Sequence, residues 1–223
     1  MALNKLKFNS LNVTPTAGKT VGFNSDADGL EATLSGGAMT FIKKLTASSS
    51  ATLSFVDGSS GVVLDDTYKE YVFIFKDIHA QTDNIYFQFN FSVDSGSNYN
   101  VTKTSTVFSS YHNESGNSTD LSYRSGSNGG LAQSTAFQNI TTPDNMSSDN
   151  DHILSGTFTV FNPSSTTFVK HYMSHCSFNN VSDHTINAFM AGYGNTTSAV
   201  DAVQFKMSSG NIESGTITLY GIN

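Results

Sequence analysis

Apolar and polar residues alternate along many short stretches of this chain. The clearest case runs from Ile85 to Val93 (IYFQFNFSV), where every odd-numbered position is apolar and every even-numbered position carries a polar atom. A period of two residues places these two sets on opposite faces of a β-strand. The stretch therefore predicts a strand with one face in a core and one face wetted by solvent.

Similar runs, rich in Phe, Val, Ile, Thr and Tyr, recur from Thr40 onward between clusters of Gly, Ser, Asn and Asp. Turn signals such as Asp57-Gly58 and the DSGSN segment at 94–98 favour antiparallel connections. No segment shows a convincing helical period. We predict an all-β, jelly-roll-like antiparallel β-sandwich with an extended N-terminal arm. Its strands are expected near 40–46, 51–56, 70–78, 84–93, 101–109, 132–139, 153–161, 167–177, 184–193, 202–208 and 215–221.

The segment 70–78 (EYVFIFKDI) is apolar on both faces. Tyr71, Phe73 and Phe75 share one face, whereas Val72 and Ile74 share the other. A strand buried on both sides lies in the middle of a fold. In a two-layer sandwich, the second face is then expected to lie under a loop, the arm or a neighbouring subunit.

The first 38 residues differ from the rest, because apolar residues are sparse and follow no period. We interpret 1–38 as a docking arm and 39–223 as the β-sandwich domain. An arm of this kind gains order only by lying on its own domain, on a sister subunit or on a partner. Its aperiodic apolar residues are the expected contacts, namely Phe8, Leu11, Val13, Pro15 and Phe23.

Two segments without periodicity are candidate functional loops. The longer, His112–Gly130, is too long for a plain hairpin turn, and loops of such length are usually functional or mobile. Tyr111, Tyr123 and Arg124 flank or occupy it and are the best available contacts for a carbohydrate, since tyrosine rings can stack on a sugar ring. The second, around Asp144–Asp151, is rich in oxygen ligands but lacks the ligand spacing of a known calcium loop, so calcium binding stays open.

Composition narrows the classes of partner. The formal net charge is -7 and the basic residues are scattered, which argues against nucleic-acid binding. No apolar run approaches the roughly 20 residues needed to cross a bilayer, and the first residues lack the apolar core of a signal peptide. We therefore expect no membrane insertion, and synthesis and assembly in a cytoplasm.

No metal site, cofactor site or catalytic residue is expected. Cys176 is the single cysteine and is interpreted as a small apolar filler. His171 and His175 would lie on one face of a strand but about 13 Å apart, too far to share an ion. No nucleophile-elbow motif appears, so we expect a non-enzymatic protein. Hydrolysis of a glycan remains a third alternative that turnover of a polysaccharide would reveal.

Three stretches resemble small structural proteins of marine tailed bacteriophages of the cyanophage and pelagiphage kind. They are FNSLNVTPTAGKTVGFNSDADGLEA from position 8, the segment 41–84, and MAGYGNTTSAVDAVQFKMSSGNIESGTITLYGIN from position 190. The resemblance spans nearly the whole chain and includes no catalytic motif. It implies a virion component with β-sandwich or jelly-roll character.

Together, these observations predict a capsid decoration or cement protein that binds the major capsid protein or another virion protein, as a homotrimer. The alternative is a tail-associated receptor-binding protein, such as part of a tail fibre. Its receptor-facing loop, with Tyr111, Tyr123 and Arg124, would then face a host surface glycan or the outer membrane. Only 13% of residues are charged, and Asn, Ser and Thr make up about a third of the chain. A surface of neutral polar groups suits a crowded virion, and we interpret the wet face of 85–93 as such a coat.

Overall fold

The computed structural model describes residues 20–23, 30–33, 38–126, 129–142 and 145–223. The chain divides into two compact units, Met1–Ala38 and Met39–Asn223. In the first unit, β1 (Thr20–Phe23) pairs with β2 (Leu30–Thr33) in antiparallel register. Four of the residues predicted to dock the arm, Phe8, Leu11, Val13 and Pro15, lie outside the described residues.

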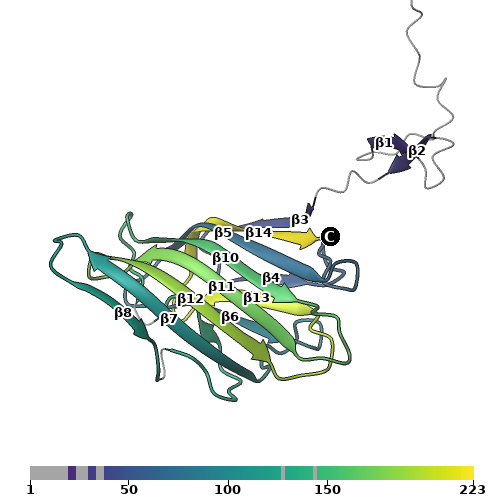
Figure 1. Ribbon diagram of the computed structural model, residues 1–223. Coiled ribbons are helices and arrows are strands. Elements are labelled where there is room, and N and C mark those ends of the chain that lie inside the picture. Colours follow the sequence, from purple (N-terminus) through teal and green to yellow (C-terminus); the bar gives the residue numbers. More distant parts are fainter. Residues whose placement is uncertain (1–19, 24–29, 34–37, 127–128, 143–144) are drawn as a thin grey trace, which may run out of the picture. The chain divides into compact units, whose positions relative to one another are not determined.

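The second unit consists of two antiparallel sheets (Figure 1). None of the described residues forms a helix, so the described part of the chain contains no helix that could cross a membrane. The larger sheet has eight strands, in the spatial order β3 (Met39–Thr46), β14 (Ile212–Ile222), β5 (Glu70–Ala80), β10 (Ile153–Phe161), β11 (Lys170–Asn179), β12 (His184–Gly194), β7 (Lys103–Asn113) and β8 (Thr119–Tyr123). The smaller sheet has four, in the order β4 (Thr52–Val56), β13 (Ala202–Met207), β6 (Phe87–Ser92) and β9 (Gln138–Asn139).

The strand order is that of a jelly roll with one sheet extended. The chain alternates between the strands β3, β14, β5 and β10 of the larger sheet and the strands β4, β13, β6 and β9 of the smaller one. Two strand pairs, β7–β8 after β6 and β11–β12 after β10, continue the larger sheet beyond β10. The predicted jelly-roll-like antiparallel β-sandwich is therefore confirmed.

Phenylalanine rings fill the space between the two sheets. Phe205 of β13 is fully buried, and five other rings surround it with centroid separations from 5.2 to 6.3 Å. The predicted alternation along this strand is confirmed, because Val203, Phe205 and Met207 are buried in the core while Gln204 and Lys206 are half-buried and Ser208 is exposed. Alternation in the sequence thus corresponds directly to the inner and outer faces of each sheet. The five rings around Phe205 belong to Phe55, Phe73, Phe75, Phe87 and Phe158.

The polar face predicted to be wet along 85–93 is wetted only in part, because Tyr86 and Gln88 are half-buried whereas the later polar positions are covered. Asn90 and Ser92 are both 0% exposed. The Nδ2 group of Asn90 donates hydrogen bonds to the carbonyl oxygens of Tyr99 (2.6 Å) and Thr135 (3.0 Å), so these two segments lie over the strand. The prediction was wrong at Asn90 and Ser92, because residues distant in sequence cover this part of a face whose local pattern is polar.

Two strand predictions also need correction. The interval His112–Gly130, expected to be a loop without strands, contains β8, which pairs antiparallel with β7 and puts Phe108 opposite Tyr123. The strand expected at 132–139 shrinks to the two residues Gln138 and Asn139 of β9. Residues 131–137 instead form bends and isolated contacts beside β7.

Strand β5 has the two apolar faces that its sequence indicates. Tyr71, Phe73 and Phe75 are buried in the core, whereas Val72 and Ile74 are half-buried on the opposite surface of the larger sheet. We call this surface, turned away from the smaller sheet, the outer face.

Replacing Phe205 with Ala is expected to destabilise the domain by about 3–5 kcal/mol, since it empties the centre of the ring cluster. The free energy of unfolding from denaturant titration measures this effect. Phe168→Ala is the matched control, because Phe168 is 68% exposed and its loss should change stability by about 0.5 kcal/mol or less. Equal effects of the two substitutions would contradict the core described above.

Candidate functional site

Antiparallel register brings four ring-bearing residues into one line across the outer face. His175 of β11 lies opposite Phe189 of β12, which lies opposite Phe108 of β7, which lies opposite Tyr123 of β8. The ring of His175 stacks on Phe189 at 4.1 Å with planes 10° apart, and Phe189 stacks on Phe108 at 5.0 Å and 12°. We call these four residues the aromatic row.

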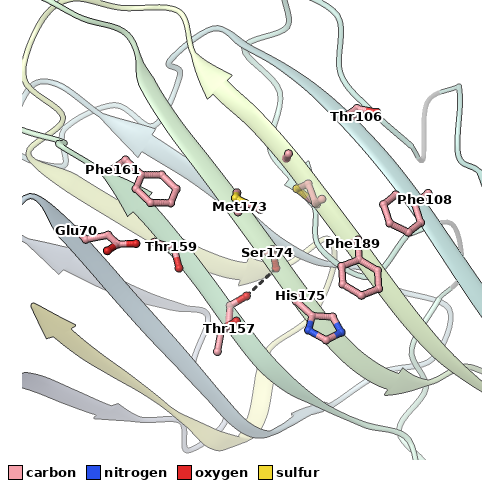
Figure 2. A pocket seen from close by; sticks show the side chains of 12 residues that line it. Glu70, Thr106, Phe108, Thr157, Thr159, Phe161, Met173, Ser174, His175 and Phe189 are labelled. Atoms are coloured by element: carbon pink, nitrogen blue, oxygen red, sulfur yellow. Dashed lines mark hydrogen bonds between the residues drawn. The ribbon is translucent and has the colours of Figure 1, made fainter. Parts of the chain in front are cut away.

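A shallow depression borders the aromatic row on the outer face (Figure 2). Its volume is about 450 Å³, and most of its lining is apolar. A second depression of about 430 Å³ shares several of these residues and continues toward His171 and Tyr193. The side chains that line both depressions come from β5, β10, β11, β12 and β7, so they are far apart in sequence. The residues common to the two are Thr106, Phe161, Met173 and Ala191.

Hydroxyl and other polar groups stand between the apolar side chains of this surface. Thr157 of β10 lies beside His175 of the aromatic row, Thr159 lies opposite Met173, and Glu70 of β5 lies at the far end of the depression, as Figure 2 shows. The Nε2 group of His175 donates to Oδ1 of Asn187 at 2.7 Å, which fixes the orientation of the imidazole ring. The surface therefore offers flat rings together with neutral donors and acceptors.

Several large apolar side chains are exposed together on the outer face. Met173 is 55% exposed, Phe108 is 48% exposed and Tyr123 is 62% exposed. Phe41 and Leu121, at the two opposite sides of the larger sheet, are exposed as well. Contiguous apolar surface of this kind marks binding sites in soluble proteins. Chemically, the site can hold an amphipathic ligand by stacking and hydrogen bonding.

Of the three residues expected in a receptor-facing loop, Tyr111 and Arg124 come together, with the guanidinium carbon of Arg124 6.0 Å from the centroid of the Tyr111 ring, whereas Tyr123 lies apart. Tyr123 lies on the outer face, as the last residue of β8. Tyr111 lies on the opposite side of β7, where its ring stacks on His184 at 4.6 Å. Arg124 turns to that same side, with its Nε donating to Ser109 at 2.7 Å. Only Tyr123 therefore belongs to the aromatic row.

Arg124 is occupied by local contacts. One terminal nitrogen of its guanidinium lies 3.2 Å from a carboxylate oxygen of Asp120. A hydrogen bond from Ser122, with a contribution from the charge of Arg124, lowers the pKa of Asp120. These contacts fix the edge strand β8 and leave Arg124 a structural role in this part of the molecule.

Phe23, the one predicted arm contact within the described residues, is 75% exposed at the end of β1. Val21 in the same strand and Leu30, opposite Phe23 in β2, are also exposed. Three apolar side chains thus lie at the surface of a two-stranded pair.

A cluster of ionisable groups lies at the acidic segment that raised the question of calcium. His152 is 3% exposed, and its ring nitrogens lie 4.0 Å from Asp149, 3.8 Å from Asp151 and 3.4 Å from Asp183. Asp144 lies outside the described residues. Within the described part of the chain, no group of three or more His, Cys, Asp or Glu side chains could hold a metal ion. The calcium question for Asp144–Asp151 stays untested.

Ser147 contacts this histidine, with its Oγ 2.5 Å from Nδ1 of His152. Ser147 is 3% exposed and also accepts a hydrogen bond from the backbone N–H of Asp149 at 3.1 Å. A nucleophile has to reach its substrate, and this hydroxyl is buried within a turn. The arrangement favours a structural role.

The residues of this candidate site that the sequence did not reveal are Phe108, Phe189 and Met173. Their strands were predicted. His175 was expected on a polar face, and it lies on the exposed face of β11 among apolar side chains. The sequence did contain one sign of this site. Phe108 in β7 and Phe189 in β12 are apolar residues at positions that face outward, where polar residues are usual. Strand order, which the sequence does not reveal, decides that these positions become neighbours.

No protein-family model matches the chain, and a search of curated proteins finds no match.

Replacing Phe108 and Met173 together with Ser is expected to remove most of the binding of an environment-sensitive apolar dye to the folded protein. Both side chains are about half exposed, so the free energy of unfolding should fall by only about 1 kcal/mol. Dye fluorescence on native protein measures the effect, with Phe168→Ser as the control for an exposed ring outside the strands. Unchanged fluorescence in the double variant would show that the outer face is not the apolar surface.

Proposed function

We propose that this chain is a non-enzymatic structural protein of a bacteriophage virion surface, and that it serves as a capsid decoration or cement protein. The N-terminal unit holds the protein on the major capsid protein, and the jelly roll is the body that it presents. The resemblance to marine phage virion proteins supports this assignment. Assembly takes place in the host cytoplasm, with three copies forming a homotrimer on the shell.

The exposure of apolar residues in the β1–β2 pair is the observation that carries the proposal. Val21, Phe23 and Leu30 lie at its surface, although an isolated two-stranded pair is only marginally stable in water. Such a pair gains stability when a partner buries its apolar side chains. Binding only to the assembled shell also shifts the assembly equilibrium toward the shell, as a cement protein requires.

Deleting residues 1–36 is expected to abolish binding to capsids that lack this protein, while the remaining domain stays folded. Cosedimentation with purified capsids measures binding, and far-ultraviolet circular dichroism with denaturant titration confirms the fold. Unchanged binding of the truncated protein would refute the docking role of the N-terminal unit.

Phe23→Ser provides a sharper version of this test. Burial of a phenylalanine contributes about 1.5–3 kcal/mol, so the affinity should fall about tenfold or more. Phe168→Ser is the matched control, because it removes a similarly exposed ring from the other unit. The control should bind as the unmodified protein does.

A second candidate function, receptor binding at a phage tail, is favoured by the outer face. Neutral hydroxyl groups beside stacked rings suit a host surface glycan, since a sugar ring has an apolar face and polar edges. The depression on the outer face has this combination, with rings in the aromatic row and hydroxyl groups at Thr157 and Thr159.

Under this second candidate, Phe108→Ala and Phe189→Ala should each weaken binding to a neutral host oligosaccharide by about three- to tenfold, because each removes one stacking ring. Isothermal titration with purified oligosaccharides measures the affinity, and Phe168→Ala is the control. Absence of any oligosaccharide binding by the unmodified protein would exclude this candidate and leave the decoration role unaffected. Turnover of the oligosaccharide would instead indicate a glycan hydrolase.

A further inference from the structure

Lys103 is buried where β7 of the larger sheet approaches β6 of the smaller one, and it has no carboxylate partner among the described residues. It is the first residue of β7 and is 0% exposed. Its Nζ donates hydrogen bonds to Oδ1 of Asn90, in β6 of the smaller sheet, and to the carbonyl oxygen of Val101 at 2.8 Å. Among the described residues, no ion pair includes Lys103. A fully buried lysine is rare without such a pair.

The surroundings of Lys103 fit the neutral amine. Burial lowers the pKa of its side chain to about 7. A neutral amine has two N–H groups, which match the two acceptors, and it keeps one free lone pair. Lysines whose pKa is lowered by burial act as nucleophiles in proteins.

Asn90 presents its carboxamide in a fixed orientation. Nδ2 donates to the carbonyl oxygens of Tyr99 and Thr135, at 2.6 and 3.0 Å. Oδ1 accepts a hydrogen bond from the backbone N–H of Phe91 at 2.8 Å, in addition to the one from Lys103. A backbone N–H directed at a carbonyl oxygen stabilises the negative charge that develops there when a nucleophile adds to the carbon. The side chain of Asn90, like that of Lys103, is 0% exposed, so solvent does not compete.

We propose that Lys103 and Asn90 form an intramolecular isopeptide cross-link between the two sheets. An amine that is hydrogen-bonded to a carbonyl oxygen lies near the separation of about 3–3.5 Å from which addition to the carbonyl carbon starts. Rotation about the Cε–Nζ bond then turns the lone pair toward Cγ of Asn90.

The reaction balances without any further reactant. The Nζ lone pair forms a bond to Cγ, and the C=O π electrons move to Oδ1, where the Phe91 N–H stabilises them. One proton passes from Nζ to Nδ2, the C=O bond forms again, and the Cγ–Nδ2 bond breaks. The products are one secondary amide, whose nitrogen retains the other Nζ proton, and one molecule of ammonia. The carbonyl oxygens of Tyr99 and Thr135 already accept hydrogen bonds from Nδ2, and they accept hydrogen bonds from the departing ammonia.

The cross-link would give a virion surface protein covalent strength across its sandwich. It joins β6 and β7, which lie in different sheets, by a bond that reducing agents do not break. This inference does not depend on the partner of the N-terminal unit, because every group involved lies within Met39–Asn223.

Lys170 is a matched control supplied by the fold itself. Gly194 of β12 lies opposite Lys103 on one side and opposite Lys170 on the other, so the two lysines occupy equivalent positions in the sheet. Lys170 is also 0% exposed, and burial lowers its pKa as well. Its Nζ donates to the backbone carbonyl oxygens of Phe168 (2.6 Å) and Thr196 (3.3 Å), and in the described part of the chain no side-chain amide is hydrogen-bonded to it.

Intact-mass spectrometry of the purified full chain tests the proposal. The expected mass is lower by one molecule of ammonia than the mass of the sequence, with any loss of Met1 taken into account. Proteolysis should release one branched peptide that joins the segments containing Asn90 and Lys103. Lys103→Arg and Asn90→Ala should each have the full mass of their sequences, whereas Lys170→Met should keep the loss of ammonia.

If a variant fails to fold, the mass of the unmodified protein is sufficient to test the cross-link. A folded wild-type chain with the full mass of its sequence after prolonged incubation would overturn the proposal. So would a branched peptide joined through any other pair of residues, or a loss of ammonia located at an unbranched Asn.

Discussion

Burial of phenylalanine rings between two sheets is the constraint on which the rest of this structure depends. Phe205 and the rings around it belong to strands from both sheets, and these strands can bring the rings together only in one register. A shift of one residue would turn every core ring of a strand to the other face. The same register therefore determines which side chains appear on the outer face, including the aromatic row.

Polar groups complete the interior at the end of the sandwich where β6 meets β7. Asn90, Lys103 and Gln138 are all 0% exposed. Each is held by hydrogen bonds, as when Nε2 of Gln138 donates to the carbonyl oxygen of Gly129 at 3.1 Å. Buried polar groups cost free energy unless they are paired, and paired networks make a core rigid. The neutral polar residues that dominate the composition thus serve partly inside the molecule, and not only as a solvent coat.

Local alternation was sufficient to predict most strands and their inner faces, as at Val203–Met207, because a period of two survives in any half-buried strand. It failed at β8, where Thr119–Tyr123 (TDLSY) is short, polar and at the edge of the sheet. It also failed at Asn90, which is covered by residues near Tyr99 and Thr135, a contact between distant segments that no local pattern encodes.

The candidate site was predictable only in part for the same reason. Tyr123 could be named from the sequence, but its neighbour Phe108 lies in another strand, and Phe189 and His175 lie more than 50 residues further along the chain. Their assembly into one row depends on the spatial order β11-β12-β7-β8, in which the inserted strand pairs meet. The sequence indicates faces of strands, whereas the order of strands comes from the packing of the whole sandwich.

The central claim is that this protein works by adhesion on the shell of a virus particle. A cryo-electron microscopy reconstruction of the virion that contains it tests this claim most directly. The account predicts density for the eight-stranded and four-stranded sandwich repeated over the capsid surface, with the N-terminal unit in contact with the major capsid protein. Density confined to the tail would contradict the decoration role, and a particle without the protein would contradict the account as a whole.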